Sequence, residues 1–167
     1  MDEKALVKLA RAGDKEAFAK LYIQLKDKLF RYAYFMLGST EDAQDAVSSC
    51  ITAAYQSIAS LKSEKAFSAW LFRILYRECC AILRHKAAHR DEQNIDDAEP
   101  VSYNDIYLAP ELKEALSLLT EEEKDIVLLS AVAGYNSKEI AAMLNLKATT
   151  VRSKLSRSLA KMRNFLE

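Results

Sequence analysis

Glycine and proline are scarce in this chain, which has three glycines and two prolines among its 167 residues. Both residues interrupt regular structure, and proteins rich in tight β turns use them far more often. Half of the residues are hydrophobic, which is enough apolar material for one medium core or for two small ones. The composition therefore predicts an all-α protein with long helices.

Apolar residues in the first half of the chain recur at intervals of three and four, as on the buried face of a helix. Gly13 and Gly38 are suited to end the first two helices, and Asp14 is suited to cap the second. Ser39 with Asp42 resembles the capping signal of a third. Four helices are expected near residues 3–12, 15–37, 40–59 and 67–88, with a polar loop over 60–65.

The segment of residues 91–110 breaks this pattern. It contains both prolines, six acidic residues and no basic residue, and it has no helical apolar period. Nearly twenty irregular residues would be unusual inside one compact domain. The sequence therefore predicts an acidic linker between two small helical domains, which cover residues 1–90 and 111–167.

The last third of the chain is dense in capping signals. Thr120 with Glu123, and Asn136 with Glu139, match the capping box that opens a helix. Asn145 tolerates left-handed backbone geometry and is expected to form a tight turn. Helices are expected near residues 111–118, 121–133, 137–144 and 148–165. A short helix, a tight turn and a long basic helix form a helix-turn-helix.

The final helix is expected to have one apolar face and one basic face. At about 100° per residue, five apolar side chains fall within an arc of about 80°: Val151, Leu155, Leu159, Met162 and Leu166. Ser158 is the one polar residue among them. The opposite arc carries a polar and basic set: Arg152, Ser153, Lys154, Ser156, Arg157, Lys161 and Arg163.

This basic face is predicted to bind DNA. Arginine can bond the guanine edge with two hydrogen bonds, and lysine and arginine hold phosphates. Residues 149–157, the first turns of the helix, would enter the major groove. A basic face can also be merely solvated, but the capped helix and turn before it favour DNA binding.

A second basic surface is expected on the fourth helix. Arg73, Arg77 and Arg84 fall within about 40° of one another around its axis. This spacing suits contacts to successive phosphates of a nucleic acid.

Three stretches of sequence resemble a known family. The stretch LTEEEKDIVLLSAVAGYNSKEIAAMLNLKATTVRSKLSRSLAKMRNFL resembles the C-terminal promoter-binding domain of sigma-70 family factors of the extracytoplasmic-function type. The stretches GSTEDAQDAVSSCITAAYQSI and FSAWLFRILYRECCAILR look like the other domain of the same family. The resemblance covers nearly the whole chain. It implies a transcription initiation factor that binds core RNA polymerase and directs it to promoters through the −10 and −35 elements.

The resemblance also implies a role for each group of site residues. The third helix would dock on the largest polymerase subunit through Asp42, Asp45, Ser48 and Ser49. The loop after it would receive a base flipped from the −10 element through Lys62, Ser63, Glu64 and Lys65. The fourth helix, with Arg73, Arg77 and Arg84, would lie along the DNA backbone. The final helix would read the −35 element through Thr149, Arg152, Ser153 and Ser156, with Lys154 and Arg157 on phosphates.

The partners that the resemblance implies are core RNA polymerase, duplex promoter DNA with a melted strand at the −10 element, and an anti-sigma factor. Two other interpretations stay open. The chain could be a stand-alone helix-turn-helix regulator with a dimerising or sensing N-terminal half. It could also be a sigma-like protein that acts only through an anti-sigma partner, because Ser48 and Ser49 replace a glutamine and an acidic residue usual in the family.

No cofactor, metal ion or catalytic activity is expected. The sequence has no glycine-rich phosphate loop and no nucleophile elbow. His85 and His89 lie near Cys79 and Cys80, but further ligands at a familiar spacing for zinc are missing. No apolar run approaches the roughly 18 residues that a membrane span needs, and residues 1–9 do not resemble a signal peptide. A cytoplasmic protein that does not insert into membranes is expected.

Overall fold

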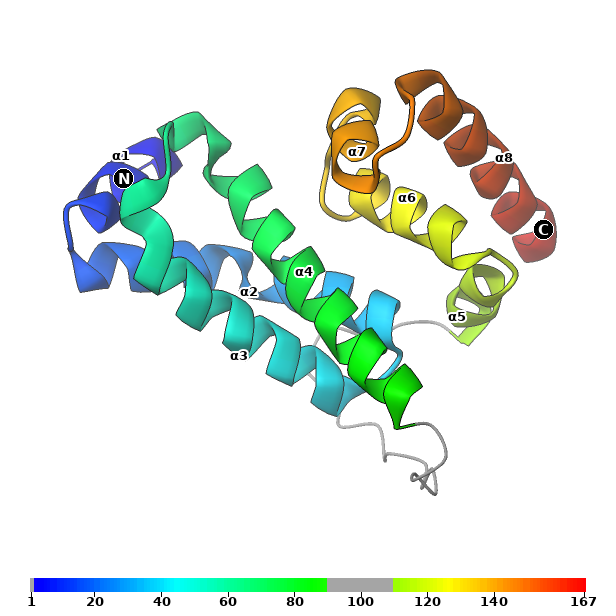
Figure 1. The fold of residues 1–167 in the computed structure, drawn as a ribbon, viewed down its shortest axis with the longest axis horizontal. Helices are drawn as coiled ribbons and strands as arrows, with labels where there is room; N and C mark the ends of the chain where they lie inside the picture. The colour runs from blue at the N-terminus through cyan, green and yellow to red at the C-terminus, as the bar shows by residue number, and fades with distance from the viewer. Residues whose placement is uncertain (1, 90–109) are drawn as a thin grey trace. The chain divides into compact units, whose positions relative to one another are not determined.

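The computed structural model of this chain describes residues 2–89 and 110–167, which belong to two compact units (Figure 1). All regular structure in the described residues is helical, which confirms the prediction of an all-α protein. The expected linker lies outside the described residues except for Pro110. That proline is the first residue of a helix and does not belong to the linker, in keeping with the preference of proline for the first helical turn.

Over residues 2–89, the N-terminal unit has four α-helices and two 3₁₀ turns: α1 (Glu3–Arg11), α2 (Lys15–Leu37), α3 (Thr40–Ser57), η1 (Ile58–Ser60), η2 (Glu64–Ala66) and α4 (Phe67–Ala88). The bounds of α2 and α4 agree with the sequence prediction, whereas α1 and α3 end slightly earlier. The loop expected over 60–65 is not purely polar, because Leu61 is buried at 4% exposure between the two 3₁₀ turns.

Local capping explains where these helices begin and end. The Asp14 carboxylate accepts a hydrogen bond from the Ala17 amide at 3.1 Å and caps α2. Gly38 closes the same helix with a φ of 72°, a left-handed conformation that glycine adopts without strain. The next residue, Ser39, accepts a hydrogen bond from the Asp42 amide at 3.2 Å and opens α3. Two adjacent residues thus end one helix and begin the next.

The core of the N-terminal unit lies where α2, α3 and α4 pack against one another. Tyr32 and Phe72 are fully buried, and their rings meet edge to face with centroids 5.8 Å apart. Cys50 is also fully buried, and its thiol donates to the Leu71 carbonyl oxygen at 3.6 Å. Burial, with a smaller contribution from Glu78, raises the pKa of Cys50 to about 12, so this thiol is a protonated core residue.

The C-terminal unit contains α5 (Pro110–Ser117), α6 (Glu121–Ala131), α7 (Ser137–Leu144) and α8 (Ala148–Leu166). The long helix α8 packs against each of the other three. Helix α6 ends two residues before the predicted position. The chain turns there because the Ala133 amide bonds back to the Leu128 carbonyl at 3.1 Å and the Tyr135 amide to the Leu129 carbonyl at 2.9 Å.

Candidate nucleic-acid interface

Helices α7 and α8 form the predicted helix-turn-helix. Asn136 and Glu139 complete a capping box at the start of α7, with both hydrogen bonds at 2.9 Å. Asn145 ends α7 in the left-handed conformation, with a φ of 58°. Ile140 of α7 and Val151 of α8 are fully buried, and the two helices are in contact. The turn and the buried contacts together fix the orientation of α8 relative to α7.

The buried face of α8 differs from the predicted one. Val151, Ser158 and Met162 are buried, whereas Leu159 and Leu166 are 44% and 48% exposed. On a helical wheel, the buried stripe is centred about 40° away from the predicted apolar arc. The expectation that all five apolar residues form the packing face is therefore wrong for Leu159 and Leu166. The helix is rotated because its neighbours pack on the side that carries the small residue Ser158.

Five of the predicted DNA-reading side chains of α8 share one exposed surface. They are Thr149, Arg152, Ser153, Ser156 and Arg157. Neither arginine forms an ion pair with any residue that the structure describes. Two unpaired guanidinium groups and three small hydroxyl side chains are thus presented together on the first turns of α8.

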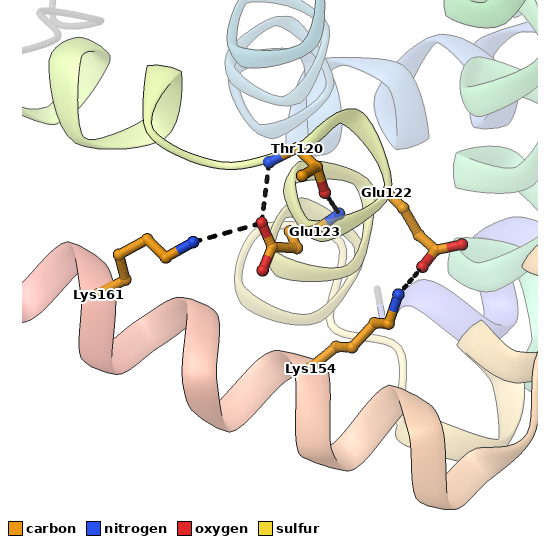
Figure 2. A network of polar contacts seen from close by, with 5 residues as sticks. All are labelled: Thr120, Glu122, Glu123, Lys154 and Lys161. Carbon is orange, nitrogen blue, oxygen red and sulfur yellow. Dashed lines mark hydrogen bonds and ion pairs between the residues drawn. The ribbon is translucent and has the colours of Figure 1, made fainter.

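The sixth predicted residue, Lys154, is arranged differently. Figure 2 shows its ammonium group paired with the Glu122 carboxylate of α6, and Lys161 near the Glu123 carboxylate, at 3.7 Å. Glu123 also accepts a hydrogen bond from the Thr120 amide at 2.9 Å, and the Thr120 hydroxyl accepts from the Glu123 amide at 3.2 Å. The Thr120 amide, and to a smaller extent Lys161, hold the pKa of Glu123 below its usual value.

The predicted −10 surface of the N-terminal unit is largely exposed. Arg73, Arg77 and Arg84 are exposed on α4 and form no ion pair within the described ranges. In the loop before this helix, Lys62, Ser63 and Lys65 are exposed. The structure thus leaves most of the predicted nucleic-acid contacts of this unit open to solvent.

Glu64 in this loop is partly buried and is held by α1. Its carboxylate lies 3.3 Å from the Arg11 guanidinium. A hydrogen bond from its own backbone amide, and then the charges of Arg11, Lys4 and Lys8, lower the pKa of Glu64. The contact between α1 and this loop was not predicted, although Lys4, Lys8 and Arg11 follow a helical spacing that places them on one face.

The predicted polymerase-binding residues on α3 divide into two groups. Asp45, Ser48 and Ser49 are exposed. Asp42 lies nearer the core and forms an ion pair with Lys86 of α4. The structure therefore brings Asp45, Ser48 and Ser49 together on an open surface, while Asp42 joins two helices of the unit.

The two histidines of α4 interact with each other. The rings of His85 and His89 stack with centroids 4.3 Å apart, and His89 Nδ1 lies 2.9 Å from the His85 carbonyl oxygen. Within residues 2–89 and 110–167, no three histidine, cysteine, aspartate or glutamate side chains are grouped as ligands for a metal ion. None of the helices described combines the length and apolar character needed to cross a membrane.

Two parts of this chain match models of known protein families. Residues 21–89 match sigma-70 region 2, and residues 110–162 match sigma-70 region 4. The chain is 30% identical over 157 residues to the ECF RNA polymerase sigma factor SigM of Mycobacterium tuberculosis, covering 93% of this chain and 80% of that protein. It is 24% identical to SigW of Bacillus subtilis, covering 98% of this chain and 96% of that protein.

Solved structures share the fold of this chain. CnrH, solved in complex with the cytosolic domain of CnrY, matches with a TM-score of 0.73 and 24% identity, covering 98% of this chain and 96% of that chain. The sigma factor RpoE of Bartonella quintana, solved with the anti-sigma factor NepR, also matches with a TM-score of 0.73, at 20% identity. That match covers 89% of this chain and 96% of the other.

Proposed function

We propose that the two units of this chain read two promoter elements. The chain belongs to the sigma-70 family, extracytoplasmic-function type. It is therefore a transcription initiation factor that directs RNA polymerase to promoters. The observation that carries this proposal is the exposed set on α8, which follows a capped helix and a left-handed turn. Its two arginines, Arg152 and Arg157, form no ion pair with any residue in the described part of the chain. Initiation factors of this kind are not in general enzymes, and we assign no reaction to this chain. We place its action in the cytoplasm.

The C-terminal unit, which the structure describes over residues 110–167, reads the −35 element. Helix α8 enters the major groove with Thr149, Arg152 and Ser153 near its leading end. Arginine forms two hydrogen bonds with guanine, and hydroxyl side chains adapt to several base edges. Ser156 and Arg157 follow one turn later, where an arginine reaches the phosphate backbone. Their common exposure supports this assignment.

The N-terminal unit, residues 1–90, binds the −10 element. The arginines of α4 hold successive phosphates, and the loop of residues 62–65 receives a base from the melted strand. The absence of competing ion pairs within the described part of the chain leaves Arg73, Arg77 and Arg84 available for phosphates. The ion pair between Arg11 and Glu64 would hold the loop in a fixed shape before DNA arrives.

Core RNA polymerase binds the exposed face of α3 through Asp45, Ser48 and Ser49. Asp42 contributes indirectly, because its ion pair with Lys86 fixes α3 against α4. Both units are held on one polymerase, so that binding of one unit to its promoter element raises the effective concentration of the other unit at its own element. Two weak contacts can therefore give strong binding together. Structures of CnrH and RpoE with protein partners also support a regulatory anti-sigma partner for this chain.

Run-off transcription tests this function. Core polymerase, this protein and the DNA upstream of its gene are expected to give a discrete transcript. Arg152→Ala should reduce that transcript by about tenfold to a hundredfold, because one bidentate base contact contributes about 1–3 kcal/mol of discrimination. Arg163→Ala is the matched control, since Arg163 is exposed on the same helix but lies beyond the first turns.

The opposite result would be equally informative. If no transcript forms and core polymerase does not retain the protein in a pull-down, promoter-directed initiation by this chain is excluded. A protein that acts only through an anti-sigma partner would then remain. If Arg152→Ala and Arg163→Ala reduce transcription equally, α8 does not read the promoter through its first turns.

A further inference from the structure

Two lysines of α8 are directed toward α6 by ion pairs. Lys154 pairs with Glu122, and Lys161 lies 3.7 Å from Glu123 (Figure 2). Both carboxylates belong to the first turn of α6, which also carries the exposed Glu121. The acidic first turn of α6 thus contacts two of the basic side chains that were predicted to belong to the DNA-binding face of α8.

The position of these lysines on α8 gives them two possible partners. With Arg152 at zero on the helical wheel, Lys161 and Lys154 lie at about 180° and 200°, next to the buried Ser158 at about 240°. The exposed set from Arg152 to Arg157 spans about 0° to 140°. The side chain of Lys154 is 32% exposed and that of Lys161 is 48% exposed. Each lysine therefore lies beside the exposed set from Arg152 to Arg157, which we call the reading face, and its ammonium group points to α6. A long lysine side chain at this edge could turn to a DNA phosphate instead.

We propose that Glu122 is a specificity-determining residue, which withholds the charge of Lys154 from DNA phosphates by pairing with it. The proposal rests on the function of α8 proposed above. Phosphate contacts are independent of sequence, so each cation that reaches the backbone strengthens binding to all DNA alike. A lysine already paired with a carboxylate contributes less to this binding. The bases are then read mainly by Arg152 and its exposed neighbours.

The charge of Glu122 acts in the same direction. A carboxylate at the edge of the reading face repels phosphates that approach Lys154, which lowers non-specific affinity further. The pair is partly exposed, at 32% for Lys154 and 41% for Glu122, and ion pairs that solvent screens contribute little to folding stability. The consequence for function is a higher ratio of specific to non-specific binding, which decides how well a protein finds its sites in a genome.

Salt-dependent binding of the full chain to a fluorescent duplex of random sequence tests the proposal. For Glu122→Gln, we expect binding to be about threefold to tenfold tighter at low salt. The slope of log K against log salt should steepen by about 0.9, the value for one additional phosphate contact. Glu121→Gln is the matched control, because it removes the same charge one residue away without releasing a lysine. It should leave the slope unchanged.

Two further variants complete the test. Lys154→Met should alter the slope little in the otherwise unchanged chain, and should abolish the gain in the Glu122→Gln background. The proposal is overturned if Glu122→Gln and Glu121→Gln give equal slopes, or if Lys154→Met alone removes one phosphate contact. We choose Glu122 for the test because Glu123 also caps α6, so its replacement changes two properties at once.

Binding to a promoter fragment separates this proposal from the function on which it rests. If Arg152→Ala weakens binding to the promoter fragment while Glu122→Gln leaves the random-duplex slope unchanged, α8 reads DNA but Glu122 does not set its specificity. If neither substitution changes binding to either duplex, the assignment of α8 to DNA also fails. Circular dichroism of each variant confirms that the helices are retained.

Discussion

Ser158 shows how one residue can alter the orientation of a helix. It is fully buried on α8, and its hydroxyl oxygen has no hydrogen-bond partner among the described residues. A buried polar group without a partner lowers stability. The small side chain nevertheless lies within the packing face, while the larger Leu159 remains 44% exposed. A sequence pattern that counts only apolar residues places the buried face too far toward the leucines.

Replacing Ser158 by alanine is expected to stabilise the C-terminal unit by about 1 kcal/mol. The substitution removes a buried hydroxyl that has no partner and leaves the volume of the site nearly unchanged. Urea denaturation followed by circular dichroism measures the effect. Ser156→Ala, on the exposed face, should change the free energy of unfolding by less than about 0.5 kcal/mol. A loss of stability in Ser158→Ala would show that the hydroxyl is hydrogen-bonded in the folded protein.

At the scale of elements, capping positions were predicted more accurately than buried faces. The boxes at Thr120 and Asn136 are both complete in the structure. Capping is decided by side chains within three residues of each other, so the sequence contains all of the relevant information. Helix α8 lacks such a side-chain cap at Lys147. Its orientation instead depends on packing against α5, α6 and α7.

The capping box of α6 should make the stability of the C-terminal unit depend on pH. The pKa of Glu123 is lowered from 4.5, so its stabilising contribution is complete above that pH and is lost as the pH falls through the lower folded value. Urea denaturation between pH 7 and pH 3 should show this loss, about 0.3–1 kcal/mol for a carboxylate in the first turn of a helix. Glu123→Gln should reduce the dependence by this amount, because glutamine can still accept the capping hydrogen bond but does not titrate.

The control for this experiment is Glu121→Gln. Glu121 lies in the same turn but takes no part in the capping box, so its replacement should leave the pH dependence as in the original chain. Equal pH dependence in the Glu123→Gln variant and the original chain would show that the ionised cap does not stabilise α6.

At the scale of the whole molecule, the chain divides into two units, each with its own core. The three helices α2, α3 and α4 pack together around the buried rings of Tyr32 and Phe72 in one unit. In the other unit, α8 packs against α5, α6 and α7. Each unit satisfies its buried apolar residues internally. This organisation suits a factor in which two small domains act on separate promoter elements.

The two units are expected to unfold independently. Trp70, the one tryptophan of the chain, belongs to α4, so its fluorescence reports on the N-terminal unit alone. Thr120→Ala should lower the stability of the C-terminal unit by about 1 kcal/mol through loss of a helix cap. The urea midpoint by circular dichroism should therefore shift, while the midpoint by tryptophan fluorescence should not. Equal shifts in both signals would mean that the units unfold as one.

The sequence by itself determined the helical class, the order and approximate ends of the helices, and the exposed polar and basic side chains on the first turns of α8. These features depend on the shortage of glycine and proline, on apolar periodicity and on caps that act over three or four residues. Only the tertiary structure decided which side of α8 is buried, that Lys154 pairs with Glu122, and that Arg11 holds Glu64. Residues 32 or 53 positions apart in sequence meet only after the helices pack, and no local pattern encodes such a contact.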